Sequence, residues 1–256
     1  MKRIFVVGVS ALAVLALAGS AAAITYGQPD GSGHPEVGAL LAPEAYPDGT
    51  WAECSGTLIS PTVFLTAAHC DEGLSEAAVT FDSSYTAPGT TYIGAWHADP
   101  NYNDHRQSDP QDLAVVVFPD PGVTGVTPAR LPEAGSLSGL SHGRPFTSVG
   151  YGAQSVTNGP GGKTLHYADV RYVASGTLNA VTPAWLRISG NPATGNGGTC
   201  YGDSGGPNFL GAGTGETNIV AAITITGDTV CRATNVDYRL DTPTARAFLG
   251  QYVTLP

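Results

Sequence analysis

The segment Gly198-Thr199-Cys200-Tyr201-Gly202-Asp203-Ser204-Gly205-Gly206-Pro207 surrounds a single serine with glycines. Glycine tolerates positive φ and close backbone approach, so such a loop can turn several N–H groups toward one developing negative charge. A hydroxyl nucleophile beside an oxyanion hole is what acyl-transfer chemistry requires. Unrelated hydrolases share the shorter pattern Gly-Xaa-Ser-Xaa-Gly, so the rest of the chain must decide the fold and the reaction.

The composition favours an all-β protein. The chain of 256 residues contains 34 glycines and 19 prolines but only 12% charged residues, so turns are frequent and long amphipathic helices are not expected. A chain of this length can bury one large β domain or two small ones. The formal charge of −10 argues against nucleic acid or an anionic membrane as a partner.

Residues 1–23 have the three parts of a secretory signal peptide. Two basic residues precede the apolar run 4–18, and three alanines follow it at 21–23. The apolar run is shorter than the roughly 20 residues of a membrane span, which argues against a membrane anchor. We therefore expect signal peptidase to cleave after Ala23, with no propeptide, and to release a secreted chain that begins at Ile24 with a formal charge of −12.

The four cysteines predict disulfides rather than a zinc site. Their number is even, the chain is expected to be exported, and no Cys-Xaa-Xaa-Cys pair is present. The residues alone allow three different pairings. The cysteines are Cys54, Cys70, Cys200 and Cys231.

Two further segments carry residues that can activate Ser204. Segments 54–60 and 63–70 read as two β segments joined by a Ser-Pro turn, and the second delivers His69 within Thr-Ala-Ala-His-Cys. Asp112 opens an apolar β run, 43 residues after His69 and 92 residues before Ser204. The other five histidines are interpreted as surface or core residues.

These motifs resemble those of the chymotrypsin-like serine proteases. The family's Gly-Asp-Ser-Gly-Gly-Pro signature is intact at Gly202–Pro207, its Thr-Ala-Ala-His-Cys motif is complete around His69, and Asp112 lies close to the family's spacing. The chain order of histidine, aspartate and serine differs from that of subtilisin-like enzymes, in which aspartate comes first. It also differs from that of α/β-hydrolases, because no histidine follows His166.

The resemblance implies an all-β, trypsin-like fold of two six-stranded antiparallel β-barrels packed face to face. The Pro-, Gly- and Ser-rich segment 119–141 suits a connection between them, which places the barrels at 24–135 and 136–256 of one peptidase domain. Segment 165–173 reads as a further strand. Thr242-Pro243, followed by apolar residues at helical spacing, predicts a short C-terminal helix.

The resemblance also implies a role for each residue of the active site. Ser204 is the nucleophile, His69 is its general base and later the general acid, and Asp112 orients the imidazole. The N–H groups of Gly202 and Ser204 form the oxyanion hole.

Two structural features follow from the same resemblance. The freed ammonium of Ile24 forms a buried activation pair with Asp203, although Tyr26 stands where the family usually has glycine. The implied disulfides are Cys54–Cys70 and Cys200–Cys231.

The specificity pocket departs most from the family. Trypsin-type enzymes carry an aspartate six positions before the nucleophile, where this chain has Gly198. In one register Ile225-Thr226-Gly227 replaces the usual Ser-Trp-Gly, and Val236 stands where glycine is usual. In the other register Thr224 takes the place of the serine and Thr226 narrows the pocket.

Both registers give a neutral pocket, so we expect an uncharged, small to medium apolar residue on the acyl side of the cut. A one-residue alignment slip would turn Asp237 inward and favour a cation instead. The predicted pocket residues are Gly198, Thr199, Ile225, Thr226, Gly227 and Val236.

We interpret the chain as a secreted, monomeric serine endopeptidase that cleaves proteins or peptides through an acyl-enzyme on Ser204. No cofactor or metal is expected, because the Asp- and Asn-rich segment 99–112 lacks EF-hand spacing and reads as a polar loop. The alternative is a secreted, catalytically silent homologue that acts as a binding module. The complete set of motifs weighs against this alternative.

Overall fold

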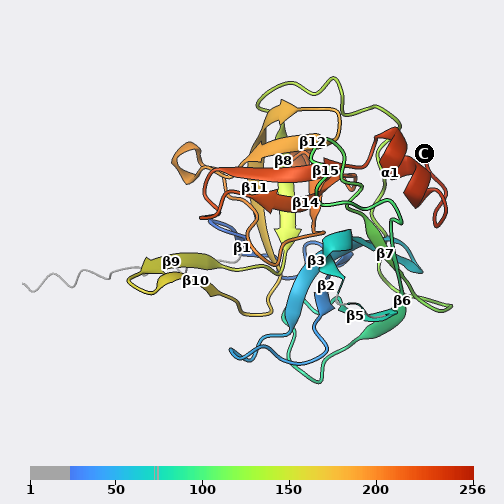
Figure 1. Ribbon diagram of the computed structural model, residues 1–256, viewed down its shortest axis with the longest axis horizontal. Coiled ribbons are helices and arrows are strands. Elements are labelled where there is room, and N and C mark those ends of the chain that lie inside the picture. Colours follow the sequence, from blue (N-terminus) through green and yellow to red (C-terminus); the bar gives the residue numbers. More distant parts are fainter. Residues whose placement is uncertain (1–23, 72, 74) are drawn as a thin grey trace, which may run out of the picture.

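Two closed six-stranded antiparallel β-barrels make up most of the molecule, and one short α-helix lies near the C-terminus (Figure 1). The computed structural model describes residues 24–256 apart from 72 and 74, so the predicted signal peptide at 1–23 lies outside the described residues. The trypsin-like fold predicted from the sequence is confirmed.

The first barrel closes because β5 returns to pair with β2. Side chains such as Phe64 and Leu65 are fully buried in its core. Gly56 makes room for this packing, since a Cβ there would lie 2.4 Å from the Phe64 ring. Its elements are β2 (Val37–Leu41), β3 (Ala52–Ser60), β4 (Val63–Thr66), the 3₁₀ turn η1 (Ala68–Cys70), β5 (Glu76–Thr80), β6 (Tyr92–Ala98) and β7 (Ala114–Val117).

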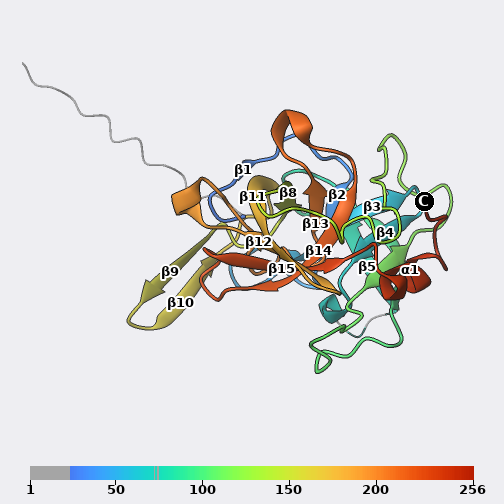
Figure 2. The same cartoon turned by 90° about the horizontal axis from the view of Figure 1, so that it is seen from above.

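The second barrel closes through the pairing of β8 with both β13 and β11. The short strand β1 (Gln28–Pro29) adds to β11, and the hairpin β9–β10 projects from the body (Figures 1 and 2). The remaining elements are β8 (Pro145–Gly150), β9 (Ser155–Gly159), β10 (Gly162–His166), β11 (Tyr172–Val181), β12 (Trp185–Ser189), η2 (Pro192–Thr194), β13 (Pro207–Leu210), η3 (Gly213–Gly215), β14 (Val220–Gly227), β15 (Thr234–Arg239) and α1 (Pro243–Leu249).

One apolar cluster spans both barrels. It joins Leu65 and Val115 of the first barrel to Val149 and Phe209 of the second, and all four side chains are almost completely buried. The shared core holds the barrels face to face, so side chains from both can meet in one site. The connection runs from the end of β7 to the start of β8, and the boundary predicted at 135 falls within it.

The C-terminal helix begins as predicted. The Thr242 side chain accepts a hydrogen bond from the Ala245 N–H, Pro243 occupies the first turn, and Phe248 and Leu249 are buried. These features satisfy an N–H group at the helix start and bury one apolar face. No helix among the described residues has the length and apolar character needed to cross a membrane.

The prediction of one continuous strand at 165–173 is wrong for the middle of this segment. β10 ends at His166 and β11 begins at Tyr172, because Asp169 takes a φ of +50° that a strand cannot contain. The Asp169 carboxylate accepts the N–H groups of Trp51 and Ala52 at 2.8–3.0 Å. The break therefore fastens a loop of the first barrel to the second.

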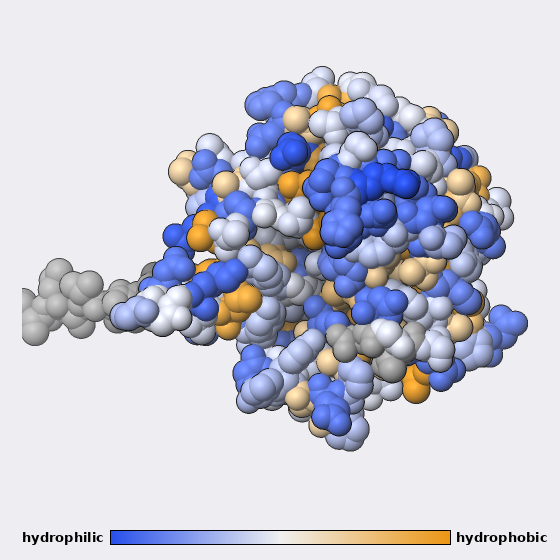
Figure 3. All heavy atoms as spheres, in the orientation of Figure 1, coloured by the Kyte–Doolittle hydropathy of each residue, from blue (hydrophilic) through white to orange (hydrophobic). Residues whose placement is uncertain are grey.

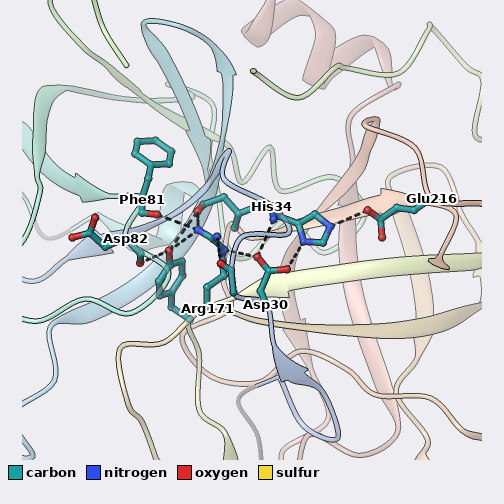
Figure 4. A network of polar contacts seen from close by, with 9 residues as sticks. Asp30, His34, Phe81, Asp82, Arg171 and Glu216 are labelled. Carbon is teal, nitrogen blue, oxygen red and sulfur yellow. Dashed lines mark hydrogen bonds and ion pairs between the residues drawn. The ribbon is translucent and has the colours of Figure 1, made fainter. Parts of the chain in front are cut away.

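A buried arginine also joins the barrels (Figure 4). Arg171 directly precedes β11 of the second barrel and is 2% exposed. Its Nη1 donates to the carbonyls of Val37 (3.0 Å) and Phe81 (3.1 Å) in the first barrel. Its Nε lies 2.7 Å from Asp30 Oδ2, and its Nη2 donates to the Gly31 carbonyl. These charge-assisted bonds compensate for burying the guanidinium.

His34 extends this network toward the loop at η3 (Figure 4). Its Nδ1 lies 2.5 Å from Asp30 Oδ1 and its Nε2 lies 2.8 Å from Glu216 Oε1, while the ring stacks on Phe209. Burial alone lowers the pKa of His34, but the hydrogen bonds and charges of Asp30 and Glu216 outweigh burial and raise it to about 9. The imidazole is therefore a cation held between two carboxylates at neutral pH.

Stability should depend on this histidine at alkaline pH. A His whose folded pKa exceeds its unfolded value stabilises the fold fully below about 6.5, and the contribution is lost as pH rises through about 9. His34→Gln should lower the free energy of unfolding by roughly 3 kcal/mol at pH 6, and this deficit should shrink between pH 6.5 and pH 9 and be nearly absent above pH 9. Urea unfolding across pH 6–10 measures it, with the exposed His142→Gln as control. A deficit that stays constant with pH would contradict the charged state.

Hydrophilic residues predominate on the face shown in Figure 3, and apolar side chains appear there as small separate patches. Among the described residues, the large apolar side chains that remain exposed are Tyr26, Tyr46, Ile93, Tyr201 and Val230. One of these tyrosines, Tyr201, lines the cavity that also contains Ser204, and another, Tyr46, lines a second cavity.

Candidate active site

His69 and Asp112 form a doubly bonded pair. His69 lies in η1, directly after β4, and its Nδ1 is 2.7 Å from Asp112 Oδ2. The backbone N–H of His69 donates to the other carboxylate oxygen, Oδ1, at 2.9 Å. Asp112 is 3% exposed, whereas 30% of the His69 side chain remains accessible. The aspartate therefore fixes the position of the imidazole and leaves its outer edge open.

The nucleophile loop is fastened to both barrels. The N–H of Ser55 in β3 donates to the Ser204 carbonyl at 2.8 Å, and the N–H of Gly205 donates to the Thr224 carbonyl in β14 at 2.7 Å. Gly202 and Gly205 have φ values of +90° and +76°, which favour glycine. A Cβ on Gly205 would also lie 2.2 Å from a side-chain oxygen of the first barrel. The glycines are therefore required by the shape of the loop.

His69 and Ser204 line one cavity of about 320 Å³. The histidine comes from the first barrel and the serine from the second, so the fold brings together two residues that are far apart in sequence. Four of the predicted pocket residues line the same cavity, and Thr224 does so as well. These four are Thr199, Ile225, Thr226 and Gly227.

The other two predicted pocket residues, Gly198 and Val236, are not among those that line the cavity. The amide of Asn235 occupies the space beside Gly198, where a Cβ would lie 2.8 Å from Asn235 Oδ1. The same oxygen accepts the N–H of Thr199 at 3.1 Å. Asn235 therefore fills the place that the missing side chain of Gly198 leaves, and sequence reasoning overlooked it.

The carboxylate that borders the cavity is Asp228, not Asp237. Asp237 is fully buried inside the second barrel, where Asn208 Nδ2 donates to it at 3.0 Å, and burial raises its pKa well above the usual range. Burial also opposes the charge of Asp228, but the backbone N–H groups of Thr234, Arg232 and Ala233 outweigh burial and lower its pKa. The cavity therefore has one ionised carboxylate at its edge, already bonded to the backbone.

The predicted activation residues are both buried in the uncleaved chain. Ile24 is fully buried, and Thr25 forms a β-bridge with Gly198. Asp203 accepts the N–H of Gly152 at 2.9 Å and that of Cys200 at 2.8 Å. Burial raises the pKa of Asp203 to about 7, against the opposing effect of these two bonds.

Both predicted disulfides are present. One lies beside His69 and the other closes the loop that leads into Ser204. Among the described residues, the one group with the composition and spacing of a metal site is Cys54, His69 and Cys70, but its two cysteines are bonded to each other. The pairs are Cys54–Cys70 and Cys200–Cys231.

The sequence model of the trypsin family matches residues 46–248. The chain belongs to the trypsin family. It is 32% identical over 206 residues to brachyurin of Leptuca pugilator, which covers 73% of this chain and 84% of the relative. It is 28% identical over 177 residues to an alkaline trypsin C of Manduca sexta, which covers 60% of this chain and 63% of that one.

A further relative, glucanase inhibitor protein 1 of Phytophthora sojae, is 28% identical over 172 residues, covering 64% of this chain and 63% of its own length. The chain thus spans less than two thirds of the length of the Manduca and Phytophthora relatives. A solved structure of HBP is 17% identical, with a TM-score of 0.66 over 90% of this chain and 97% of that one, and supports the fold alone. Membership of this protease family implies a protein substrate.

Proposed function

We propose that the protein is a secreted, monomeric serine endopeptidase whose nucleophile is Ser204. The observation that carries this proposal is the pair of hydrogen bonds, at 2.7 and 2.9 Å, that Asp112 accepts from His69, together with the cavity that His69 and Ser204 both line. The serine, histidine and aspartate have the residue types and chain order of the catalytic triad. The relatives named as proteases support the same reaction class.

The first half of the reaction acylates Ser204. His69 Nε2 removes the hydroxyl proton while the serine oxygen attacks the carbonyl carbon of the substrate. The negatively charged Asp112 stabilises the imidazolium that forms, through the bond to Nδ1. The N–H groups of Gly202 and Ser204 bind the oxyanion. Losing one such donor raises the activation free energy by about 3 kcal/mol.

Collapse of this intermediate expels the amine. His69 donates the proton that it took from Ser204 to the leaving nitrogen, so the imidazole is neutral again when the acyl-enzyme forms. Water then enters, His69 removes its proton, and the ester bond to Ser204 breaks by the same steps in reverse order. The products are a carboxylic acid and an amine.

The pocket should favour an uncharged, small to medium apolar residue on the acyl side of the cut. Gly198 provides no carboxylate, Asn235 fills the adjacent space, and Asp228 already accepts backbone N–H groups. Burying a lysine or arginine head without a counter-charge costs several kcal/mol. Cleavage of a mixed peptide library should show Ala, Leu or Phe preferred over Lys and Arg by at least about tenfold.

This library tests activity and pocket together. A tenfold preference for Arg or Lys would contradict the neutral pocket, and loss of that preference in Asp228→Asn would identify its source. Cleavage at no peptide would contradict the enzymatic proposal itself. It would favour a catalytically silent binding protein, the alternative suggested by the relative named as an inhibitor.

We also propose that cleavage after Ala23 creates the active N-terminus. The new Ile24 ammonium would pair with Asp203, which is fully buried and has its pKa raised to about 7 by burial. A carboxyl whose folded pKa exceeds its unfolded value makes the uncleaved chain less stable as pH rises from about 4 through 7. In the cleaved chain the Ile24 ammonium compensates the Asp203 charge in place of the bound proton. The stability that the ammonium contributes is lost as pH rises above about 8 through the folded pKa of the amine.

A chain that begins at Ile24 should therefore be more stable at pH 7 than one that retains Ala23, by on the order of 3 kcal/mol. The difference should narrow at pH 4, where Asp203 is protonated in the chain that retains Ala23 and no longer buries an unpaired charge. Urea unfolding at the two pH values measures it. N-terminal sequencing of the secreted enzyme supplies the second check, since active protein that starts before Ile24 would contradict the proposal.

A further inference from the structure

A second cavity borders the nucleophile loop. Its volume is about 390 Å³, and its walls include the rings of Tyr46 and Tyr167 and the acidic residues Asp48 and Glu53. Two of its lining residues lie next to the nucleophile loop, because a Cβ on Gly202 would be 3.3 Å from Tyr167 Cε1 and 3.6 Å from the Glu53 carbonyl oxygen. The mechanism described above does not use this cavity.

The loop that forms one wall is held in a fixed shape. The Tyr46 N–H donates to the Thr50 carbonyl at 2.8 Å, and Asp48 Oδ1 accepts both the N–H (3.0 Å) and the hydroxyl (2.7 Å) of Thr50. The hydroxyl bond, followed by the backbone bond, lowers the pKa of Asp48, which is therefore ionised. Asp169 fastens the next residues, Trp51 and Ala52, to the second barrel.

Residues that line the two cavities meet at Gly202. Tyr201 and Ser204 line the first cavity, and Gly202, which lies between them in the chain, abuts the second. A peptide whose acyl side occupies the first cavity places its carbonyl oxygen at the Gly202 N–H. Its leaving-group side would then pass Gly202 toward Glu53 and Tyr167, which lie next to this glycine.

Aromatic rings beside carboxylates attract cations. The face of a tyrosine ring binds an ammonium or guanidinium group, and an ionised carboxylate nearby adds Coulomb attraction. The nucleophile loop already contains one such cation–π contact, in which Lys163 Nζ lies 3.8 Å from the centroid of the Tyr201 ring. The pKa of Tyr167 is raised to about 12 by burial and then by surrounding groups that include Asp203 and Asp48, as expected in a negative field.

We propose that this cavity selects a lysine or arginine side chain on the leaving-group side of the scissile bond. The inference rests on the proposed endopeptidase function and assigns Tyr46, Asp48 and Tyr167 as its specificity residues. Both long side chains can lay an apolar stem against the rings while the charged head reaches Asp48. The enzyme would then combine a neutral preference before the cut with a basic preference after it.

The test uses peptides that differ in one side chain. Lysine or norleucine is placed in turn at each of the first three positions after a fixed cleavage site. At one position kcat/KM should be about tenfold higher with lysine, the combined effect of a cation–π contact and a partly exposed charge pair. Asp48→Asn should reduce this ratio to about threefold, as should high salt. Glu133→Gln, at an exposed carboxylate that borders neither cavity, should leave the ratio unchanged.

Equal kcat/KM for lysine and norleucine at all three positions would overturn the inference. A lysine-to-norleucine ratio of kcat/KM that is as large in Asp48→Asn as in the wild type would do so as well. A chromogenic ester with no amino acid on its leaving side reports the chemistry at Ser204 alone, so its turnover separates failure of this site from failure of the proposed function. If that ester is not hydrolysed, calorimetric binding of the lysine and norleucine peptides decides. Tighter binding of the lysine peptide that weakens in Asp48→Asn supports the site, and equal binding rejects it.

Discussion

Replacing Ser204 with alanine should reduce kcat by about 10⁶-fold while the protein still folds and is secreted. The serine hydroxyl supplies the oxygen that forms the bond to the acyl group, and alanine has no such oxygen. The backbone of the loop is held independently by the Ser55 N–H and by the bonds of Gly205 and Gly206 to Thr224. Thermal unfolding of the variant should therefore match that of the wild type.

His69→Ala should cause a loss of similar size, and the double variant should be little worse than either single one. The two residues act as a unit, so removing the base already removes the nucleophile. A serine-directed phosphonylating reagent should label Ser204 in the wild type but not in His69→Ala. The exposed Ser141→Ala is the control, with labelling and rate unchanged. Normal activity in Ser204→Ala, or stoichiometric labelling at another serine, would overturn the assignment of Ser204 as the nucleophile.

The fold was predictable because its signals are short and ordered along the chain. The nucleophile signature at Gly202–Pro207, the histidine motif around His69 and the paired cysteines each fit one family in one order. Capping at Thr242 likewise placed the helix from local residues alone. Such features need no knowledge of which strands pair.

The pocket and the network between the barrels were not predictable because they depend on pairing between distant strands. Between β14 and β15, Thr224 pairs with Asp237 but Thr226 pairs with Val236, so the register shifts at a bulge. The burial of Asp237 inside the second barrel therefore depends on a strand register that composition cannot reveal.

The bonds of His34 show the same limit. One of its partners, Asp30, is four residues away, and the other, Glu216, is 182 residues away. A lone histidine carries no signal for such a partner. The break between strands at Asp169 was unpredictable for the same reason. Its carboxylate accepts N–H groups of residues that are 117 and 118 positions away in the sequence.

Asp112→Asn should test the aspartate more sharply than its deletion. The wild-type carboxylate accepts two bonds, one from the backbone N–H of His69 and one from its Nδ1. An asparagine has a single acceptor oxygen. The backbone N–H cannot change its protonation, so it retains that oxygen and the amide NH₂ then faces Nδ1.

The imidazole can meet this NH₂ only by making Nδ1 the acceptor, which places its one proton on Nε2. His69 can then no longer take a proton from Ser204, and kcat should fall by about 10⁴-fold, as it does in the corresponding substitution of a related protease. Steady-state kinetics and thermal unfolding measure it together, because the isosteric change should leave the fold intact. Asp99→Asn is the matched control: Asp99 is also buried and its oxygen also accepts a backbone N–H, yet it does not border the cavity. A loss of less than tenfold in Asp112→Asn would mean that Asp112 does not set the tautomer of His69.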